Sequence, residues 1–368
     1  MIFNRIVLWI AAIGCLIGGL DRVLGNRFGL GEKFEEGLKS MGPLALAMGG
    51  LICLSPVFAK FLGPLISPAF EAIGCDPAMF GAILPSDTGG FPLAMSLAKS
   101  EEAGYYSGLI VASMFGAALT FMIPVGFSLI EKKDAPYYAR GMLIGMIAVP
   151  FGCIFGGLLA GFSLSMVLVN IIPIAIMVIL ICLGLKLFPN QMIRGCEYFG
   201  KLIVIICTVG FACAGFESLS GFPLIPGMSG IDEAMAIIGQ IAVVLMGFMP
   251  VISLFLRAAN GALEKIGRKV GMNAAASAGF FVSFVNPIPF LSMYKDMNPK
   301  GKIVTAAVVA SSSAAFGDLL GFTAAANADY IFPVVVGKCF GSAVALILAL
   351  LLTKNAEPCD RKIMEETT

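Results

Sequence analysis

Long apolar runs separated by short polar connections dominate the chain. Because an α-helix needs roughly 20 residues to cross a bilayer, each run is predicted to be one membrane helix. The nine predicted spans lie at residues 6–20, 41–59, 105–130, 141–160, 164–185, 201–216, 234–256, 303–322 and 331–353. The first is interpreted as a helix and not as a secretory signal, since no small-x-small cleavage site precedes Asp21. The pattern predicts an all-α polytopic membrane protein.

Two further apolar segments are interrupted at mid-length by polar and helix-breaking residues, at Pro85–Gly90 and at Asn286–Pro289. Non-helical backbone is tolerated at membrane depth only where it is buried in protein or lines a watery cavity. A matched pair of broken segments in two halves of a chain is typical of a transporter with its site near the bilayer midplane. We expect residues 77–99 and 271–295 to form re-entrant or broken helical hairpins.

The two halves of the chain resemble each other. Pro56 matches Pro250 at an offset of 194, and Phe115 matches Phe316 at 201, with further matches between them in the same order. Chance self-alignment of glycine-rich apolar sequence is the alternative to a true repeat. The repeat predicts a first repeat with the N-terminal helix at 1–162, a linking helix at 163–195, a second, inverted repeat at 196–354 and a cytoplasmic tail at 355–368.

The Lys and Arg residues predict the orientation of the repeats, because these residues gather in cytoplasmic loops. If both broken segments are hairpins, Arg5, Lys60 and Lys99 lie on one face, and all other Lys and Arg except Lys338 lie on the opposite face. If both segments cross fully, the positive residues divide almost evenly. The first arrangement obeys the rule. It places the N-terminus outside and the C-terminus inside, and one hairpin enters from each side.

Composition excludes most soluble functions. Hydrophobic residues make up 58% of the 368 and charged residues 13%, against roughly 25% charged in ordinary globular proteins. The net charge of +1 gives no basic surface for nucleic acid. The chain has no histidine, and its ten cysteines never form Cys-x-x-Cys, so no metal site, cofactor or histidine-based hydrolase is predicted. The expected environment is the lipid bilayer.

Asp87 is the first candidate substrate-binding residue, since it lies in a broken segment between Ser86 and Thr88. A carboxylate with neighbouring hydroxyls and opened backbone can hold a small polar cation or a coupling ion. The alternative is structural: the three side chains can cap a half-helix that begins near Gly90. The two roles overlap, because a cap can also belong to a site.

Three other polar residues at or near membrane depth complete the candidate site. Asp318 stands where the repeat places an alanine, and its alternative is a solvated position near the interface. Asn286 offers an amide between freed carbonyls, or is a turn residue before proline. Glu217 ends a predicted span, and its alternative is a solvent-exposed side chain without a binding role. Lys338 in the last span either snorkels or pairs with Asp318 or Asp87, and such a pair would occupy the carboxylate.

At these residues the chain resembles the EutH family, the ethanolamine permeases of bacterial ethanolamine utilisation. The resemblance covers nearly the whole length. It is carried by residues 35–37, 41–48, 87–91, 225–228, 286–289, 295–302 and 316–323. In the family pattern a histidine often follows the aspartate that matches Asp318, whereas this chain has Leu319. A titrating role for that neighbour is therefore not carried over.

The resemblance implies uptake of ethanolamine across the bacterial inner membrane for its breakdown. A small ammonium with a hydroxyl needs one carboxylate and one neutral hydrogen-bonding group, which Asp87 or Asp318 with Asn286 would supply. The alternatives are a transporter for another amine, an amino acid or a cation, and, more remotely, an intramembrane aspartyl protease. That protease motif, Gly-x-Gly-Asp, is broken here by Ala315. Ion coupling and the oligomeric state, including a homo-oligomer, stay open.

Overall fold

The computed structural model describes residues 2–84 and 87–353, without the side chains of residues 87, 88, 259, 260, 262–264 and 266. Within these residues every regular element is helical. In chain order the elements are α1 (Ile2–Val23), α2 (Leu30–Lys39), α3 (Met41–Leu44), the π-helix η1 (Ala45–Gly49), α4 (Gly50–Ala72), η2 (Pro77–Met79), α5 (Phe80–Ile83), η3 (Asp87–Gly90), α6 (Phe91–Leu97), α7 (Glu101–Tyr105), the π-helices η4 (Tyr106–Gly116) and η5 (Ala118–Met122), α8 (Ile123–Leu129), η6 (Lys132–Asp134), α9 (Ala135–Leu159), α10 (Leu164–Asn170), α11 (Ile172–Leu187), α12 (Pro189–Ser220), α13 (Ile231–Lys269), α14 (Ala274–Ser283), α15 (Pro287–Met293), η7 (Tyr294–Asp296), α16 (Pro299–Ser312), α17 (Asp318–Asn327), η8 (Ala328–Tyr330) and α18 (Ile331–Leu352).

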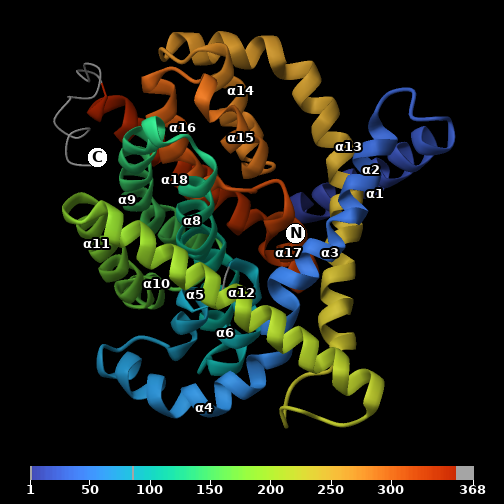
Figure 1. Ribbon diagram of the computed structural model, residues 1–368, viewed down its shortest axis with the longest axis vertical. Helices are drawn as coiled ribbons and strands as arrows, with labels where there is room; N and C mark the ends of the chain where they lie inside the picture. The colour runs from blue at the N-terminus through green and yellow to red at the C-terminus, as the bar shows by residue number, and fades with distance from the viewer. Residues whose placement is uncertain (1, 85–86, 354–368) are drawn as a thin grey trace.

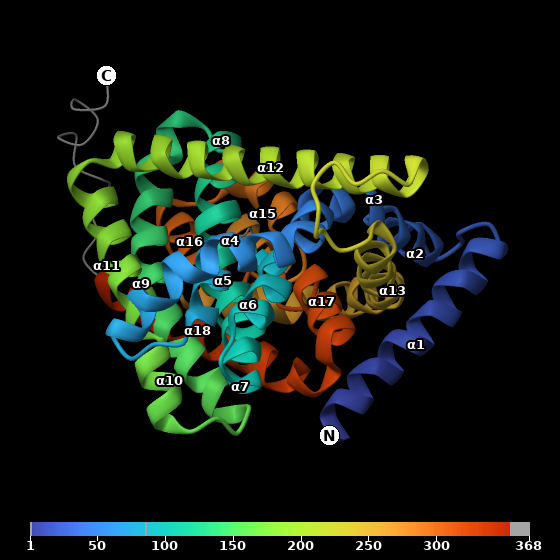
Figure 2. The ribbon, with the colours of Figure 1, turned by 90° about the horizontal axis from the view of Figure 1, so that it is seen from below.

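Eight helical segments of the described residues are long and apolar enough to cross a membrane. They are Ile2–Val23, Leu30–Ala72, Glu101–Leu129, Lys132–Leu159, Leu164–Leu187, Pro189–Ser220, Ile231–Ala258 and Asp318–Leu352. The prediction of an all-α protein with several membrane-length helices is confirmed. Figures 1 and 2 show α1, α2 and α13 packed together at one side of the molecule.

The predicted continuous helix at 303–322 is wrong. Helix α16 ends at Ser312, and α17 begins only at Asp318. The hydroxyls of Ser311 and Ser312 both donate to the carbonyl of Val308, 3.3 and 2.9 Å away. Serine side chains that bond to nearby backbone in this way compete with the helical ladder. The chain therefore has a break here that the apolar pattern concealed.

The first broken segment folds back on itself, and its two ends meet. We call residues 77–97 hairpin 1. The carboxylate of Asp76, just before it, accepts from the backbone N–H of Lys99, just after it, at 3.1 and 3.3 Å. The same carboxylate accepts from Ala78 N–H at 2.9 Å and so caps η2. One aspartate thus starts the hairpin and closes its base.

The second broken segment closes in the same manner with asparagines. We call residues 274–293, which comprise α14 and α15, hairpin 2. Asn273 caps α14 through Ala276 N–H at 3.0 Å and donates to Asp296 O at 2.8 Å. Asn298 caps α16 and donates to Gly271 O at 2.9 Å. In Figure 1 hairpin 1 (α5, α6) lies in the lower half and hairpin 2 (α14, α15) in the upper half.

Close glycine contacts hold the centre of the molecule, where α9 packs on both α16 and α18. A Cβ atom built on Gly145 of α9 would lie 2.2 Å from the carbonyl oxygen of Ala307 in α16. A Cβ atom built on Gly152 would likewise lie 2.9 Å from Gly337 O, and one built on Gly156 would lie 3.5 Å from Gly337 Cα. Small residues let helix backbones approach closely, as is common in membrane helix pairs. These three helices, together with the buried π-helix η4 that packs on all of them, form the centre of the protein.

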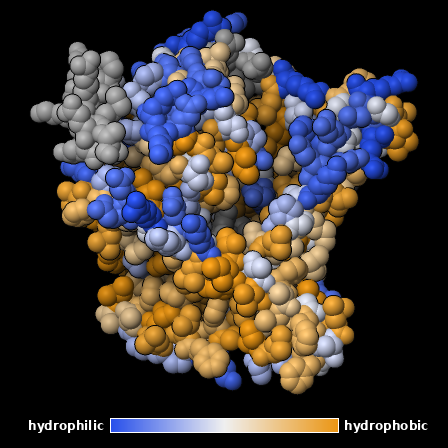
Figure 3. Space-filling view, viewed as in Figure 1, coloured by the Kyte–Doolittle hydropathy of each residue, from blue (hydrophilic) through white to orange (hydrophobic). Residues whose placement is uncertain are grey.

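Helix α9 separates two ends of different character. Its 25 residues span roughly 37 Å at about 1.5 Å per residue. We call residues 130–134 with 294–302 the lysine-rich end, and residues 71–76, 98–100 and 163–170 the pocket end. The hydropathy surface in Figure 3 has hydrophilic residues gathered over the top and apolar residues over the lower flanks.

Candidate functional site

Two helix breaks of the second half meet at backbone level. The N–H of Ala314 donates to Ser283 O at 3.1 Å, and the N–H of Phe316 donates to Phe284 O at 2.8 Å. The first break joins α14 to α15, and the second joins α16 to α17. The second break thus provides N–H donors, and the first provides carbonyl acceptors, for backbone groups that have no partner within their own helices. The backbone is thereby satisfied without water. We call this contact the break crossing.

The break crossing is tightly built and locally strained. Ala314 has a φ of 50°, in the left-handed region that residues other than glycine rarely adopt. Gly317 is required by close approach, because a Cβ atom there would lie 2.1 Å from Val285 O. Backbone held in such sparsely populated conformations persists only where surrounding structure fixes it, and it gathers at functional sites.

The crossing brings two of the predicted site residues to one place. Asn286 and Asp318 each lie two residues beyond a backbone group of the Phe316–Phe284 hydrogen bond. Asn286 caps α15, with its Oδ1 accepting from Ile288 N–H at 2.9 Å. Asp318 begins α17, and its Oδ1 accepts from Leu319 N–H at 3.0 Å. Both side chains are half-buried, so the Asn286 cap and the Asp318 carboxylate each remain partly accessible.

Lys338 is fully buried in α18, close to the crossing. Its ammonium donates a hydrogen bond to the carbonyl of Ser113 in η4, and its charge acts on the carboxylate of Asp318. The lysine therefore does not snorkel to the surface. The bond to Ser113 joins the second half of the chain to the first near the candidate site. One helical turn further along α18, the Ser342 hydroxyl donates to the Lys338 carbonyl.

The remaining predicted residues differ in how far the structure places them. Ser86 lies outside the described residues. Asp87 and Thr88 begin η3, which packs on η4, but their side chains are outside the described part. Glu217 is half-buried near the end of α12, which packs on α4. Its binding role stays a prediction.

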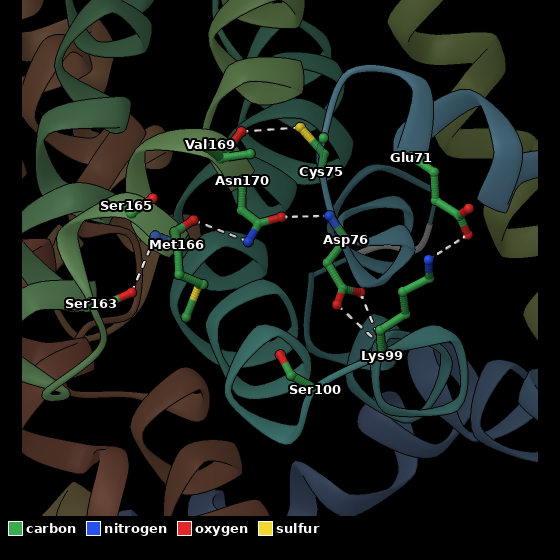
Figure 4. Close-up of a pocket in the computed structure, with 11 residues that line it drawn as sticks. Glu71, Cys75, Asp76, Lys99, Ser100, Ser163, Ser165, Met166, Val169 and Asn170 are labelled. Atoms are coloured by element: carbon green, nitrogen blue, oxygen red, sulfur yellow. Dashed lines mark hydrogen bonds and ion pairs between the residues drawn. The ribbon is translucent and has the colours of Figure 1, made fainter.

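A polar pocket of about 490 Å³ opens at the pocket end. Figure 4 shows its residues converging from three segments: the end of α4 and the turn after it, the α6–α7 connection, and α10. Asn170 is buried and accepts from Asp76 N–H at 2.7 Å, while Cys75 Sγ donates to Val169 O at 3.0 Å. These bonds fix the base of hairpin 1 against α10. The sequence did not single out this pocket.

A buried ion pair lies at the lysine-rich end, which the sequence also did not single out. Lys302 Nζ and Asp134 Oδ1 are 2.5 Å apart, with side chains only 8% and 3% exposed. The second carboxylate oxygen of Asp134 is buried without a hydrogen-bond partner. Lys302 Nζ lies 5.9 Å from the centroid of the Tyr294 ring, and the Tyr294 hydroxyl donates to Lys302 O.

The neighbouring charged pair at this end is exposed. Lys133 and Glu131 are 2.6 Å apart, with 67% and 48% of their side chains exposed. The hydrogen bond from Lys133 holds the pKa of the Glu131 carboxyl below its usual value. In the part of the chain that the structure describes, no group of three or more acidic or cysteine side chains gathers closely enough to hold a metal ion.

Broken helices that meet inside a multi-pass helical protein, with polar side chains at the breaks, are typical of membrane transport proteins. The chain matches the family described as "Ethanolamine utilisation protein, EutH" over residues 3–352. It belongs to the EutH family.

Relatives of known name cover nearly the whole chain. It is 42% identical to "Probable ethanolamine permease EutH" of Listeria monocytogenes over 96% of this chain and 95% of the relative. It is 38% identical to the protein of the same name from Escherichia coli, over 99% and 98%. A Bacillus subtilis relative named "Uncharacterized protein YxeR" is also 38% identical, over 96% of each. No solved structure matches the chain.

Proposed function

We propose that this protein carries ethanolamine, as its ammonium form, across the bacterial inner membrane by alternating access or facilitated diffusion. The relatives are named as permeases for this compound, which supports a transporter and not an enzyme. The observation that carries the proposal is the break crossing, where Ala314 and Phe316 bond to the backbone of hairpin 2. Opened backbone of this kind forms the substrate and ion sites of secondary transporters.

We further propose that the two halves are inverted repeats. Both contain a long proline-interrupted helix, a capped hairpin, an apolar helix and then a 3₁₀ turn leading into a long final helix. The final helices α9 and α18 pack on each other through paired glycines. The caps at Asp76 and Asn273 occupy the same place before each hairpin. These correspondences support a repeat covering 1–162 and 196–354, joined through 163–195.

Within the proposed site, Asp318 and Asp87 select the positive charge of the ammonium, and Asn286 recognises the hydroxyl. A carboxylate is the chemically matched partner of an ammonium, and an amide can both donate to and accept from a hydroxyl. Ser86 and Thr88 stand beside Asp87 in sequence and offer further hydroxyls. Lys338 sets a limit on this assignment, since its charge also acts on Asp318.

Binding and flux of labelled ethanolamine, measured in purified protein and in proteoliposomes, test the proposal. A charge-assisted hydrogen bond contributes about 1.5–3 kcal/mol, so Asp318→Asn and Asp87→Asn should each raise the apparent Kd roughly ten- to a hundred-fold. Asn286→Ala should weaken binding with expression intact. Ser292→Ala is the matched control, because Ser292 lies exposed on the same helix as the Asn286 cap and bonds only to Ile288 O.

Two outcomes would contradict the site. If both aspartate variants bind ethanolamine normally, the carboxylates serve Lys338 and not the substrate. In that case Lys338→Met should restore folding of the Asp→Asn variants without changing affinity. Competition by choline, amino acids and inorganic cations tests the substrate itself. Stronger inhibition by one of these than by ethanolamine would assign the site to that compound. Imposed proton and sodium gradients would separate coupled from facilitated transport.

A further inference from the structure

The pocket at the pocket end lies where several membrane-length helices end together. Glu71 is one residue from the end of the segment Leu30–Ala72. Lys99 and Ser100 directly precede Glu101–Leu129, and Ser163 directly precedes Leu164–Leu187. Residues at such positions lie at the level of lipid headgroups, not in the hydrocarbon layer. The pocket therefore opens to the interface between membrane and water.

Both signs of charge line this pocket, and they are held weakly enough to rearrange. Lys99 Nζ lies 2.8 Å from Glu71 Oε1, with side chains 58% and 43% exposed. Exposed pairs of this kind contribute little net stability, so Lys99 can exchange its partner at small cost. The carboxylate of Asp76 points into the space between α10 and the α6–α7 connection, as Figure 4 shows. Its own bonds go to backbone N–H groups.

Serine hydroxyls add hydrogen-bond donors, with Ser100 beside Lys99 and Ser163 on the wall formed by the start of α10. Ser100 Oγ accepts from Ala103 N–H at 3.2 Å, and Ser163 Oγ accepts from Met166 N–H at 3.3 Å. A hydroxyl that accepts in this way still has its O–H to donate elsewhere. Ser165 lines the same wall. The pocket thus offers an ammonium and hydroxyls for an anion, and two carboxylates for a cation.

Exposed apolar side chains adjoin the polar lining. Leu164 and Leu168 alternate along α10 with the lining residues Ser163, Ser165 and Val169, and they are 54% and 45% exposed. Ile73, between the lining residues Glu71 and Gly74, is 48% exposed. Polar groups for a headgroup and an apolar surface for hydrocarbon therefore stand side by side.

We propose that this pocket binds the headgroup of a zwitterionic phospholipid that carries a primary ammonium, as in phosphatidylethanolamine. Lys99 and the serine hydroxyls hold the phosphate, Asp76 and Glu71 hold the ammonium, and the leucines of α10 contact the acyl chain. Free ethanolamine shares the aminoethyl group but has no phosphate for Lys99. It would also leave most of a pocket of about 490 Å³ empty, a size that suits larger ligands.

This inference does not rest on ethanolamine being the transported substrate. The pocket lies between the base of hairpin 1 and α10. A bound headgroup would therefore bridge Lys99, which follows hairpin 1, to Ser163, which caps α10. The lipid would act as a clasp on that base. A lipid site of this kind is separate from the break crossing, which lies on the second half of the chain.

Native mass spectrometry of the full-length protein in detergent tests the proposal, with phosphatidylethanolamine, phosphatidylcholine and phosphatidylglycerol titrated separately. Phosphatidylethanolamine should bind about tenfold tighter than the other two, since choline has no N–H to donate and glycerol carries no cation. Lys99→Ala and Asp76→Asn should each remove about tenfold of that preference. Lys60→Ala is the matched control, an exposed lysine on α4 outside the pocket.

Three results would overturn the proposal. The first is equal binding of the three lipids to the wild-type protein. The second is an unchanged preference for phosphatidylethanolamine in Lys99→Ala and Asp76→Asn, matching Lys60→Ala. The third is displacement of the lipid by free ethanolamine with the same dependence on Asp76, which would assign the pocket to the free amine. If Asp76→Asn fails to fold, Glu71→Gln replaces it, because Glu71 is exposed and caps no helix.

Discussion

The lysine-rich end and the pocket end each contain a lysine from the segment that follows a hairpin, paired with a carboxylate, but in opposite environments. Lys302, after hairpin 2, meets Asp134 with both side chains more than nine-tenths buried. Lys99, after hairpin 1, meets Glu71 with about half of each side chain in solvent. Removing one partner of a buried pair costs about 3–5 kcal/mol, whereas an exposed pair contributes about 0–1 kcal/mol.

The comparison shows that two pairs of the same charge type lie in opposite environments, one buried and one exposed. The lysine-rich end is sealed by charges that cannot separate cheaply and by the buried rings of Tyr138 and Tyr294, 5.5 Å apart. The pocket end is held by backbone caps and exposed pairs around an open pocket. We therefore expect the lysine-rich end to separate less easily than the pocket end.

The largest expected effect comes from Lys302→Met, which leaves the Asp134 carboxylate buried without its cation. We expect a loss of about 3–5 kcal/mol in the free energy of unfolding, measured by denaturant or thermal unfolding in detergent. The double variant Lys302→Met with Asp134→Asn should lose less, because it removes the uncompensated charge. Lys133→Met, the exposed control, should leave the stability nearly unchanged, because water screens an exposed pair. Equal losses in Lys302→Met and Lys133→Met would abolish the contrast.

A pair of glycines at the two hairpin bases gives the next test. A Cβ atom on Gly301 would lie 2.4 Å from Ala276 Cβ, whereas one on Gly104 would lie 2.5 Å from the Met95 sulfur, with the nearest alanine Cβ, that of Ala98, 3.2 Å away. Alanine cannot move aside, but a methionine thioether can. Gly301→Ala should therefore destabilise the protein by about 1–3 kcal/mol, and Gly104→Ala should stay within about 1 kcal/mol of wild type. Unfolding measurements that reverse this order would show that the pocket end is the tighter one.

How much of this was predictable from sequence depends on the signal each feature leaves. The hairpins were predictable, because Pro287 and Pro289 interrupt an apolar run and hairpin 1 contains the polar run after Pro85. The break before Asp318 was not predicted, since the apolar run continues through it. Its signal was the Ser311–Ser313 triplet, which remains compatible with a helix until the hydroxyl bonds are seen.

The contacts of the site could not be predicted from one chain. Nothing in the sequence pairs Lys338 with Ser113, 225 residues away, or Lys302 with Asp134, 168 residues away. Such partners are fixed by how helices far apart in sequence pack together. Asn286 and Asp318 were named for their chemistry, and only the fold shows that hydrogen bonds between their two breaks bring them to one place.

The smallest expected effect is a pH dependence of the exposed pair at the lysine-rich end. Lys133 lowers the folded pKa of Glu131, whose ordinary value is about 4.3. A carboxyl with a lowered folded pKa stabilises the protein above its unfolded pKa, and this contribution is lost as pH falls through the folded pKa. The small difference in Tm between wild type and Lys133→Met should therefore be present at about pH 7 and shrink as the pH falls through the lowered folded pKa of Glu131. A difference that grew on acidification would contradict the assignment.

The glycine contacts between α9 and α18 have a mechanical consequence. Where Gly152 and Gly156 meet Gly337, backbone touches backbone without intervening side chains that could change rotamer. Sliding one helix along the other would drive bulkier neighbours into that contact, so the two helices behave as one stiff frame. Hairpin 1 packs on η4 and hairpin 2 packs on α16, and both η4 and α16 pack in turn on α9. We therefore expect any movement of the hairpins to occur relative to α9 and α18, which stay fixed with respect to each other.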